Sequence, residues 1–385
     1  MEEKSESGMV VLAKKFTPEA QAELDRQMKW REQADKNAKK AARARLAALN
    51  AQKPAIARAV AAYRRLDHGD ITDVRIRSEF VHVEKGARTG APRTAVWNRK
   101  DDLATRPPLT KLIASAGSRA LPVYLTALYV AQLRANATAK AFTNNLPNLP
   151  TSGTMPCWAE LAGVRSDLDS SRSPAESRRQ WRRSLTTSID SLVEYELVAL
   201  TQPAGRAGKY DQFRILMDDG TKLPYKAAGE SVGPLEAVRL PSAFFFNGWH
   251  LALTPAEIAT LLVIADRTER LRPARRLEDD VRYVGADLKT TVRWDEYGLS
   301  DEAYNSVHML HALGIIQLID PMPDRARPLA VARTVTADDG TQTTRFVNQS
   351  RIPFRLVYPP ADRTVDSLYT ENAVAAVKAI LDPET

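Results

Sequence analysis

Residues 173–200 read SPAESRRQWRRSLTTSIDSLVEYELVAL, and they predict one long helix that runs into a strand. Ser173, the proline after it and Glu176 form the pattern of a capping box, in which a hydroxyl and a carboxylate satisfy free N–H groups at a helix start. We therefore expect a helix over residues 174–195. The apolar run at 197–200 then predicts a strand.

One side of this helix is apolar and the other carries positive charge. At 100° per residue, the stripe that must face a core contains Trp181, Leu185, Ile189 and Leu192. The outward side and its flanks carry Arg179, Arg182, Arg183, Thr186 and Thr187. Arg178 points near the apolar stripe, so we expect it to clamp locally or to reach a phosphate sideways.

The elements around this helix follow a recognisable order. An apolar helix is expected at 121–135 and a short one at 158–164, both before the long helix. Two strands, at 197–200 and 211–217, are joined by the Gly/Arg-containing turn at 203–209. Three helices closed by a two-stranded ribbon are the order of a winged helix, a variant of the helix-turn-helix.

The same order returns farther along the chain. A second capping box at 254–257 opens an apolar helix at 258–271, and a short helix is expected at 294–299. A third helix from Ser300 to about Leu313 leads to strands at 315–319 and 354–358. The stretch SLVEYELVAL at 191–200 aligns without a gap with MLHALGIIQL at 309–318, and both repeats share Trp-x-Glu near the short helix. This predicts two domains of one kind.

The arginines favour double-stranded DNA as the partner of the first repeat. Arginine is well shaped to bind guanine O6 and N7 with two hydrogen bonds, and it also pairs with phosphate. The N-terminal half of a recognition helix enters the major groove. The expected contacts are Arg172, Arg178, Arg179, Arg182, Arg183, Thr186 and Thr187 of the helix, with Arg206 and Lys209 of the wing.

The second repeat is less basic. Its third helix carries Asp301 and Glu302, which phosphates would repel. In this repeat we expect Asn305 to contact a base edge, and we expect Arg325 and Arg327 of the long wing to contact phosphates. We expect the second repeat to serve in assembly of the protein, with a homodimer as one possibility, and to contact the phosphate backbone.

The N-terminal region is a basic arm. Of the net charge of +8, residues 1–66 hold +7, from 15 basic and 8 acidic residues. Thr17-Pro18-Glu19 predicts a helix start, with helix to about Asn50 and a second helix at 55–66. Additional DNA contacts are expected at Lys36, Lys39, Lys40, Arg43 and Arg45. A solvated, disordered tail is the alternative for this arm.

Between the arm and the first repeat, residues 71–85 alternate between apolar and polar, as a half-buried strand does. Turn residues follow, and residues 94–98 read as a return strand. We expect a hairpin here. The domains are then an arm at 1–66, winged helices at 67–228 and 229–368, and a C-terminal helix or tail at 369–385.

Several classes of protein are set aside. The longest apolar run, around 121–133, is too short to span a membrane, and a single cysteine excludes a disulfide framework, so a cytoplasmic protein is expected. No phosphate-binding glycine loop or nucleophile elbow occurs. His308 and His311 have helical spacing but no further ligand, and we expect core or boundary histidines. We expect no enzyme, metal, cofactor or small-molecule substrate.

The tandem order behind a basic helical region resembles the initiator proteins of plasmid replication. The resemblance implies binding of repeated origin sites and repression of the protein's own promoter as a dimer. In those initiators the C-terminal domain usually makes the main contacts with the major groove. In this sequence the arginines instead favour the N-terminal winged helix for that role. The fold class expected is mainly α with small β-ribbons (α+β): two tandem winged helices behind a basic helical arm. The competing function is a protein-interaction scaffold whose winged helices bind protein and whose arm pairs with a partner helix.

Overall fold

The structure of the chain is a computed structural model in which small antiparallel sheets lie among helices. This agrees with the α+β class. It describes residues 18–66, 71–83, 106–114, 119–134, 146–151, 155–165, 173–202, 208–228, 237–275, 285–320, 330–336, 342–348 and 354–382. Two compact units are formed, residues 1–50 and residues 51–385.

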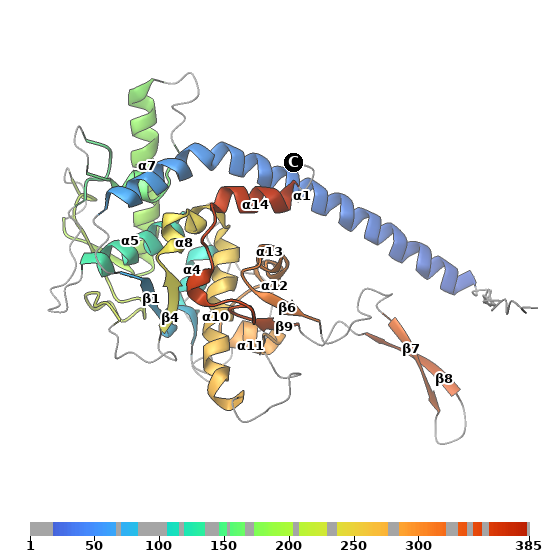
Figure 1. The fold of residues 1–385 in the computed structure, drawn as a ribbon. Coiled ribbons are helices and arrows are strands. Elements are labelled where there is room, and N and C mark those ends of the chain that lie inside the picture. The colour runs from blue at the N-terminus through green and yellow to red at the C-terminus, as the bar shows by residue number, and fades with distance from the viewer. Residues whose placement is uncertain are drawn as a thin grey trace, which may run out of the picture. The chain divides into compact units, whose positions relative to one another are not determined.

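The first helix, α1, runs without interruption from Pro18 to Arg65 (Figure 1). The expectation of a separate second helix at 55–66 is wrong, because Pro54 lies inside α1. A proline removes one helical hydrogen bond, and strong helix formers on both sides with burial beyond it offset that loss. Ile56, Ala59 and Tyr63 are buried, so residues 51–65, which we assigned to the arm, are packed in the second unit.

Strand β1 (Asp73–Arg77) does not form the hairpin that the sequence predicted. It pairs antiparallel with β4 (Ala237–Pro241), a strand far along the chain, and the return strand expected at 94–98 lies outside the described residues. The strand is also shorter than expected, because residues 78–81 form the short helix α2 (Ser78–Val81). Ser78, Phe80 and Val81 are buried there, and this burial overrides the alternating pattern.

The β1–β4 ribbon contains a repeat that the sequence analysis missed. Val-Arg-Ile at 74–76 and Val-Arg-Leu at 238–240 lie in equivalent places, each followed by a serine and a phenylalanine at the same spacing. The two copies pair antiparallel, and their central residues, Arg75 and Arg239, lie opposite each other in the middle of the ladder. Each strand is followed by a short helix, α2 in one copy and α8 (Ala243–Phe246) in the other.

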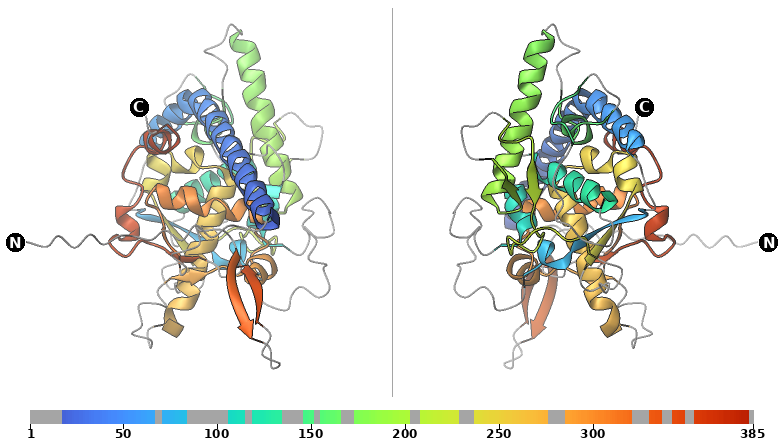
Figure 2. Two further views of the ribbon diagram at one scale, coloured as in Figure 1. Left: turned by 90° about the vertical axis from the view of Figure 1, so that its right-hand side faces the viewer. Right: turned by 90° about the vertical axis from the view of Figure 1, so that its left-hand side faces the viewer.

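We call residues 71–228 the first module. Its larger elements are α4 (Pro108–Ala114), α5 (Ala120–Arg134), α6 (Trp158–Leu161), α7 (Pro174–Glu194), β2 (Val198–Leu200) and β3 (Phe213–Ile215). The three helices and two strands that the sequence predicted are among them, whereas α4 was not predicted. Helices α5 and α6 pack against α7, and β2 pairs antiparallel with β3. The buried side chains between them include Leu128, Trp158, Leu185 and Phe213. Figure 2 shows the N-terminal end of α7 projecting beyond the neighbouring helices.

We call residues 237–358 the second module. It contains α8, α9 (Trp249–Ala252), α10 (Pro255–Arg275), β5 (Ala286–Asp287), α11 (Thr290–Asp295), α12 (Asp301–Tyr304), α13 (Val307–Ala312), β6 (Gln317–Ile319) and β9 (Arg355–Val357). The capping box is confirmed, because Thr254 N donates to Glu257 Oε2 (2.8 Å) and Glu257 N to Thr254 Oγ1 (3.2 Å). The sheet has the order β5–β9–β6, so the two strands expected here do pair.

Two expectations for the second module are wrong. The short helix covers Thr290–Asp295 rather than 294–299, so Trp294 lies at its end, whereas Trp158 begins α6. The shared Trp-x-Glu therefore does not mark equivalent positions. The third helix is interrupted at residues 305–306, which form a turn between α12 and α13.

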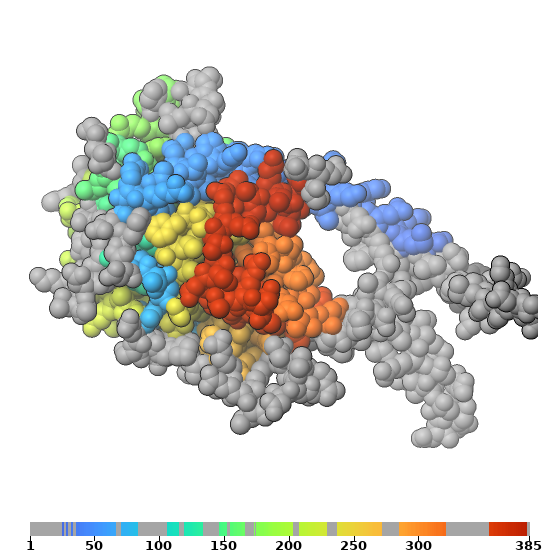
Figure 3. All heavy atoms as spheres, viewed as in Figure 1, coloured from blue at the N-terminus to red at the C-terminus, as the bar shows by residue number. Residues whose placement is uncertain are grey.

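The remaining elements lie between and after these strands. Strands β7 (Ala330–Thr336) and β8 (Gln342–Asn348) form an antiparallel hairpin inside the long wing. The turn η4 (Val365–Ser367) precedes α14 (Ala373–Leu381), which packs against α9, and the C-terminal residues form one surface with this part of the second module (Figure 3). None of the helices in the described ranges has the length and apolarity needed to cross a membrane.

Candidate nucleic-acid interface

Helix α7 begins where the sequence predicted. Glu176 N donates to Ser173 Oγ (3.3 Å), and Ser173 N donates to Glu176 Oε2 (3.0 Å). This reciprocal pair is the predicted capping box, and it occupies Glu176 in holding the helix end. The carboxylate beside the arginines therefore has a local structural role.

The apolar stripe of α7 is confirmed as the side that faces the core. Trp181 is 5% exposed, and the stripe residues after it are equally buried: Leu185, Ile189 and Leu192. The guanidinium of Arg58, from the end of α1, lies over the Trp181 ring at 5.7 Å. The stripe fixes how α7 is rotated, and so it fixes which side chains face solvent.

All the described arginines of α7 are exposed. The wheel predicted this for Arg179, Arg182 and Arg183, whereas it placed Arg178 near the apolar stripe. Arg178 donates to the carbonyl oxygen of Pro150 at 3.4 Å, which is the local clamp expected for it. The other guanidiniums make no hydrogen bond or ion pair with any residue that the structure describes; these are Arg179, Arg182 and Arg183. A row of exposed guanidiniums of this kind retains its donors for a partner.

The two threonines of the predicted site differ. Thr187 is exposed, whereas Thr186 is half-buried and its hydroxyl donates to the carbonyl oxygen of Arg183 at 3.1 Å. Thr186 therefore has only acceptor capacity left. Both lie on α7 after the arginines, closer to the strand β2.

The base of the wing is attached to the outward side of α7. Tyr210 donates to Asp190 Oδ2 at 2.9 Å, and Lys209 Nζ lies 3.6 Å from Asp190 Oδ1. The Tyr210 hydroxyl, followed by Asp190, raises the pKa of Lys209, so the ammonium stays charged. The sequence analysis predicted that Lys209 contacts DNA, whereas in the structure its ammonium group lies beside the Asp190 carboxylate.

Several predicted contacts lie outside the described residues, namely Arg172, Arg206, Arg325 and Arg327. The arm residues lie in the first unit, on α1. Four of them are exposed and Arg45 is half-buried; the four are Lys36, Lys39, Lys40 and Arg43. Residues 36–45 contain five basic side chains and no acidic one, so this part of α1 is a positively charged helix.

The second module presents a different surface at the equivalent place. Asp301, Glu302 and Asn305 are exposed, and Asn305 lies in the turn between α12 and α13. Arg293, the nearest basic residue of α11, is 7% exposed; it contacts the Asp301 carboxylate and lies 4.5 Å from the Tyr304 ring centre. Its charge is therefore directed into the module.

The two spaced histidines are exposed, which differs from the core or boundary position expected for them. His311 Nδ1 lies 3.3 Å from the carbonyl oxygen of Ile316, and the His308 ring meets Phe354 edge-on at 5.5 Å. His308 lies at the start of α13 and His311 near its end. In the described part of the chain, no three His, Cys, Asp or Glu side chains lie close enough to hold a metal ion.

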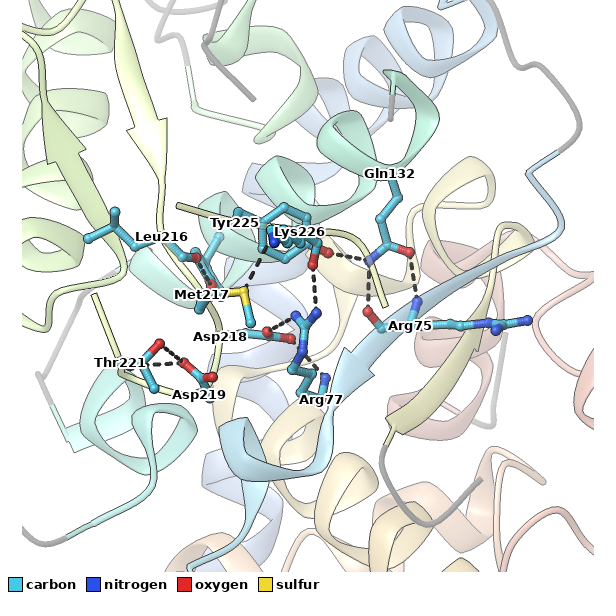
Figure 4. Close-up of polar contacts among 11 residues, drawn as sticks. Arg75, Arg77, Gln132, Leu216, Met217, Asp218, Asp219, Thr221, Tyr225 and Lys226 are labelled. Carbon is cyan, nitrogen blue, oxygen red and sulfur yellow. Dashed lines mark hydrogen bonds and ion pairs between the residues drawn. The ribbon is translucent and has the colours of Figure 1, made fainter. Parts of the chain in front are cut away.

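A buried polar network joins the segment after β3 to β1, and sequence reasoning missed it (Figure 4). Arg77 Nη1 lies 2.7 Å from Asp218 Oδ1, and Arg77 N donates to Asp218 Oδ2 at 2.8 Å. Burial raises the pKa of Asp218, and the adjacent Arg77 counteracts this. Gln132 binds both the N–H and the carbonyl of Arg75, at 2.9 and 2.7 Å. The sequence did contain one signal for this segment: the Val-Arg pair at 74–75 is repeated at 238–239, and a serine follows each pair at the same spacing.

A second network joins β1 to the second module. The Ser78 hydroxyl contacts the Asp266 carboxylate, which also accepts from Tyr297 (2.9 Å) and Arg270 (2.9 Å). Val83 N donates to the carbonyl oxygen of Glu296 at 2.8 Å. Residues 73–83 thus bind elements of both modules and hold them in one unit.

No protein-family model, no curated protein and no solved structure matches the chain. The interface is therefore interpreted from its own residues.

Proposed function

We propose that this protein is a sequence-specific double-stranded DNA-binding protein that acts in plasmid-type replication initiation or in transcriptional regulation. The observation that carries the proposal is the row of exposed guanidiniums on the outward side of the N-terminal half of α7, made by Arg179, Arg182 and Arg183. In this proposal each module is a winged helix, with α7 as the recognition helix of the first and α12–α13 at the equivalent place in the second.

The chemistry of α7 suits the major groove. Arg179 and Arg183 are four residues apart, so they lie one above the other on the outward side of the helix. Each guanidinium presents a planar set of donors that matches the acceptors of guanine or a phosphate. Because no described residue engages them, binding DNA breaks no contact within the protein at these positions.

The other basic elements fit nonspecific attraction to the phosphate backbone. In this proposal the arm contributes through the residues of α1 between Lys36 and Arg45, and the wing contributes through Arg206. The second module, with Asp301 and Glu302 exposed, serves assembly and contacts phosphate through its long wing. The protein binds without catalysing a reaction, and it needs no cofactor.

The test is a selection of duplexes from a random pool, followed by titration of the selected duplex at several salt concentrations. We expect log K to fall linearly with log salt, by about 0.9 per phosphate contacted. Arg183→Ala should weaken the selected duplex by about 1–3 kcal/mol and relax preference at one base position. Arg178→Ala is the matched control, because its guanidinium already binds Pro150. Equal losses on selected and random DNA would mean that Arg183 touches only phosphate.

The scaffold function is tested by removing the first unit. Residues 51–385 form a compact unit and keep α7 intact, so a truncated chain lacking residues 1–50 should still prefer the selected duplex, with lower affinity. If all duplex binding disappears with the arm, the modules do not read DNA. A protein-interaction scaffold is then the better description.

A further inference from the structure

The base of the wing is held to α7 by three side chains that bind one another. Tyr210 donates to both carboxylate oxygens of Asp190, at 3.0 and 2.9 Å. Lys209 Nζ lies 3.1 Å from the Tyr210 hydroxyl and 3.6 Å from Asp190 Oδ1, and 4.7 Å from the centre of the Tyr210 ring. All polar groups of this cluster therefore have a partner within it.

The same short segment is fixed at two further points. Asn148 Nδ2 donates to Asp211 Oδ1 at 2.9 Å, and Thr201 Oγ1 donates to the carbonyl oxygen of Gln212 at 2.5 Å. Gly208 has φ +79°, and an added Cβ would lie 2.9 Å from Asp211 Oδ2, so the turn requires glycine here. Residues 208–212 are thus attached to α7, to Thr201 directly after β2 and to the loop before α6.

Asp190 lies on the side of α7 that is proposed to face DNA. Asp190 lies on the outward side of α7, the side that carries Arg179 and Arg183, where an acidic group opposes a polyanionic partner. In the structure this carboxylate binds Lys209 and Tyr210.

We propose that Asp190 is a positioning residue that sets the wing relative to α7, and that Lys209 serves this joint instead of contacting a phosphate. The inference rests on the proposed DNA-binding function, and it assigns a role to a residue pair within that same interface. By holding the wing before DNA arrives, the joint reduces the ordering that binding would otherwise require.

The direction in which Asp190→Ala changes DNA affinity distinguishes a positioning role of Asp190 from simple repulsion of the phosphates. Removing an acidic residue near DNA normally strengthens binding, because repulsion is lost. If Asp190 positions the wing, Asp190→Ala should instead weaken the selected duplex by roughly five- to tenfold, through lost preorganisation. Asp190→Asn keeps an acceptor for Tyr210 and should recover the affinity. Glu194→Ala is the matched control, since Glu194 is an exposed acid of α7 with no partner among the described residues.

The slope of log K against log salt tests Lys209 separately. Lys209→Gln should leave the slope unchanged, whereas a variant that loses a phosphate contact lowers its magnitude by about 0.9. Arg206→Gln is the comparison in the same wing. A slope lowered by Lys209→Gln, or tighter binding by Asp190→Ala, overturns the inference.

Hydrogen exchange distinguishes failure of this inference from failure of the proposed function. In the full chain without DNA, Asp190→Ala should speed exchange of the amides of residues 211–216 and leave the amides of residues 178–186 unchanged. Unchanged exchange in the wing would overturn the positioning role, whatever the DNA result. Faster exchange in a protein that binds no duplex would support the joint and refute the proposed function.

Discussion

Helices α7 and α12–α13 occupy the same place in the order of their modules, yet they differ in length and in charge. Helix α7 is 21 residues long and presents exposed arginines, whereas α12 is four residues long and presents Asp301 and Glu302. The nearest arginine of the second module, Arg293, is buried against Asp301 and Tyr304. Among the described residues of these two segments, the arginines of α7 face solvent, whereas Arg293 is directed into the protein.

The largest expected effect concerns the buried ion pair that joins β1 to the segment after β3. Arg77 pairs with the fully buried Asp218, while the equivalent position of the second copy is Pro241. Arg77→Met leaves a buried carboxylate without its cation and should lower the free energy of unfolding by roughly 3–5 kcal/mol. Urea denaturation measures this. Arg75→Met is the control, since its ion pair with Asp73 is at 3.6 Å and partly exposed, and it should cost less than about 1 kcal/mol.

A slightly smaller effect is expected on DNA binding. Replacing Arg179, Arg182 and Arg183 together by alanine should weaken the selected duplex by about 3 kcal/mol, roughly a hundredfold. Replacing Asp301 and Glu302 by Asn and Gln should leave binding unchanged or strengthen it. Anisotropy titrations at one salt concentration measure both. If the acidic pair proves as important as the arginines, the contrast between the modules is wrong.

The histidines of the second module provide a pH test of intermediate size. Burial lowers the pKa of His250 to about 3, so the folded protein keeps this ring neutral while the unfolded chain protonates it near pH 6.5. Stability from this group is present above pH 6.5 and is lost as the pH falls toward 3, by about 2 kcal/mol between pH 7 and pH 5.

His250→Leu should remove that part of the pH dependence of unfolding. His308→Ala is the control: its pKa is lowered in the same direction by partial burial and by His311, and the ring is exposed, so its contribution should be smaller. Identical pH profiles for wild type and His250→Leu would contradict a neutral buried ring.

The smallest effects compare the two capping boxes. Ser173→Ala and Thr254→Ala should each lower the free energy of unfolding by about 1 kcal/mol. The second should cost more, because Glu257 is 3% exposed and loses a partner inside the protein, whereas Glu176 is exposed. Thermal unfolding measures both, and a larger effect of Ser173→Ala would reverse this order.

Local signals in the sequence were sufficient for the helices and strands that carry the candidate site. The capping boxes at Ser173 and Thr254 fixed two helix starts, and the spacing of Trp181, Leu185, Ile189 and Leu192 fixed the rotation of α7. These signals succeed because neighbouring residues on one helix determine them. The exposure of the arginines followed directly from that rotation.

Long-range pairing was not available from local signals. The alternation in residues 71–85 indicated a strand but not its partner, and the burial of Phe80 that ends the strand depends on helices far along the chain. The attachment of Lys209 to Asp190 was missed for a related reason. A basic residue in a wing reads as a phosphate contact until the carboxylate on the neighbouring helix is placed beside it.

The pairing of β1 with β4 bears on how the chain folds as it is made. Arg75 and Arg239 are 164 positions apart, so the first strand emerges from the ribosome long before its partner exists. At about 5–20 residues per second, the delay is on the order of ten to thirty seconds. During that interval the backbone of residues 73–77 lacks its partner strand, and Gln132 of α5 arrives first to bind Arg75. This amide side chain covers the edge of β1 that faces away from β4, whereas the edge that pairs with β4 stays open until β4 has been made.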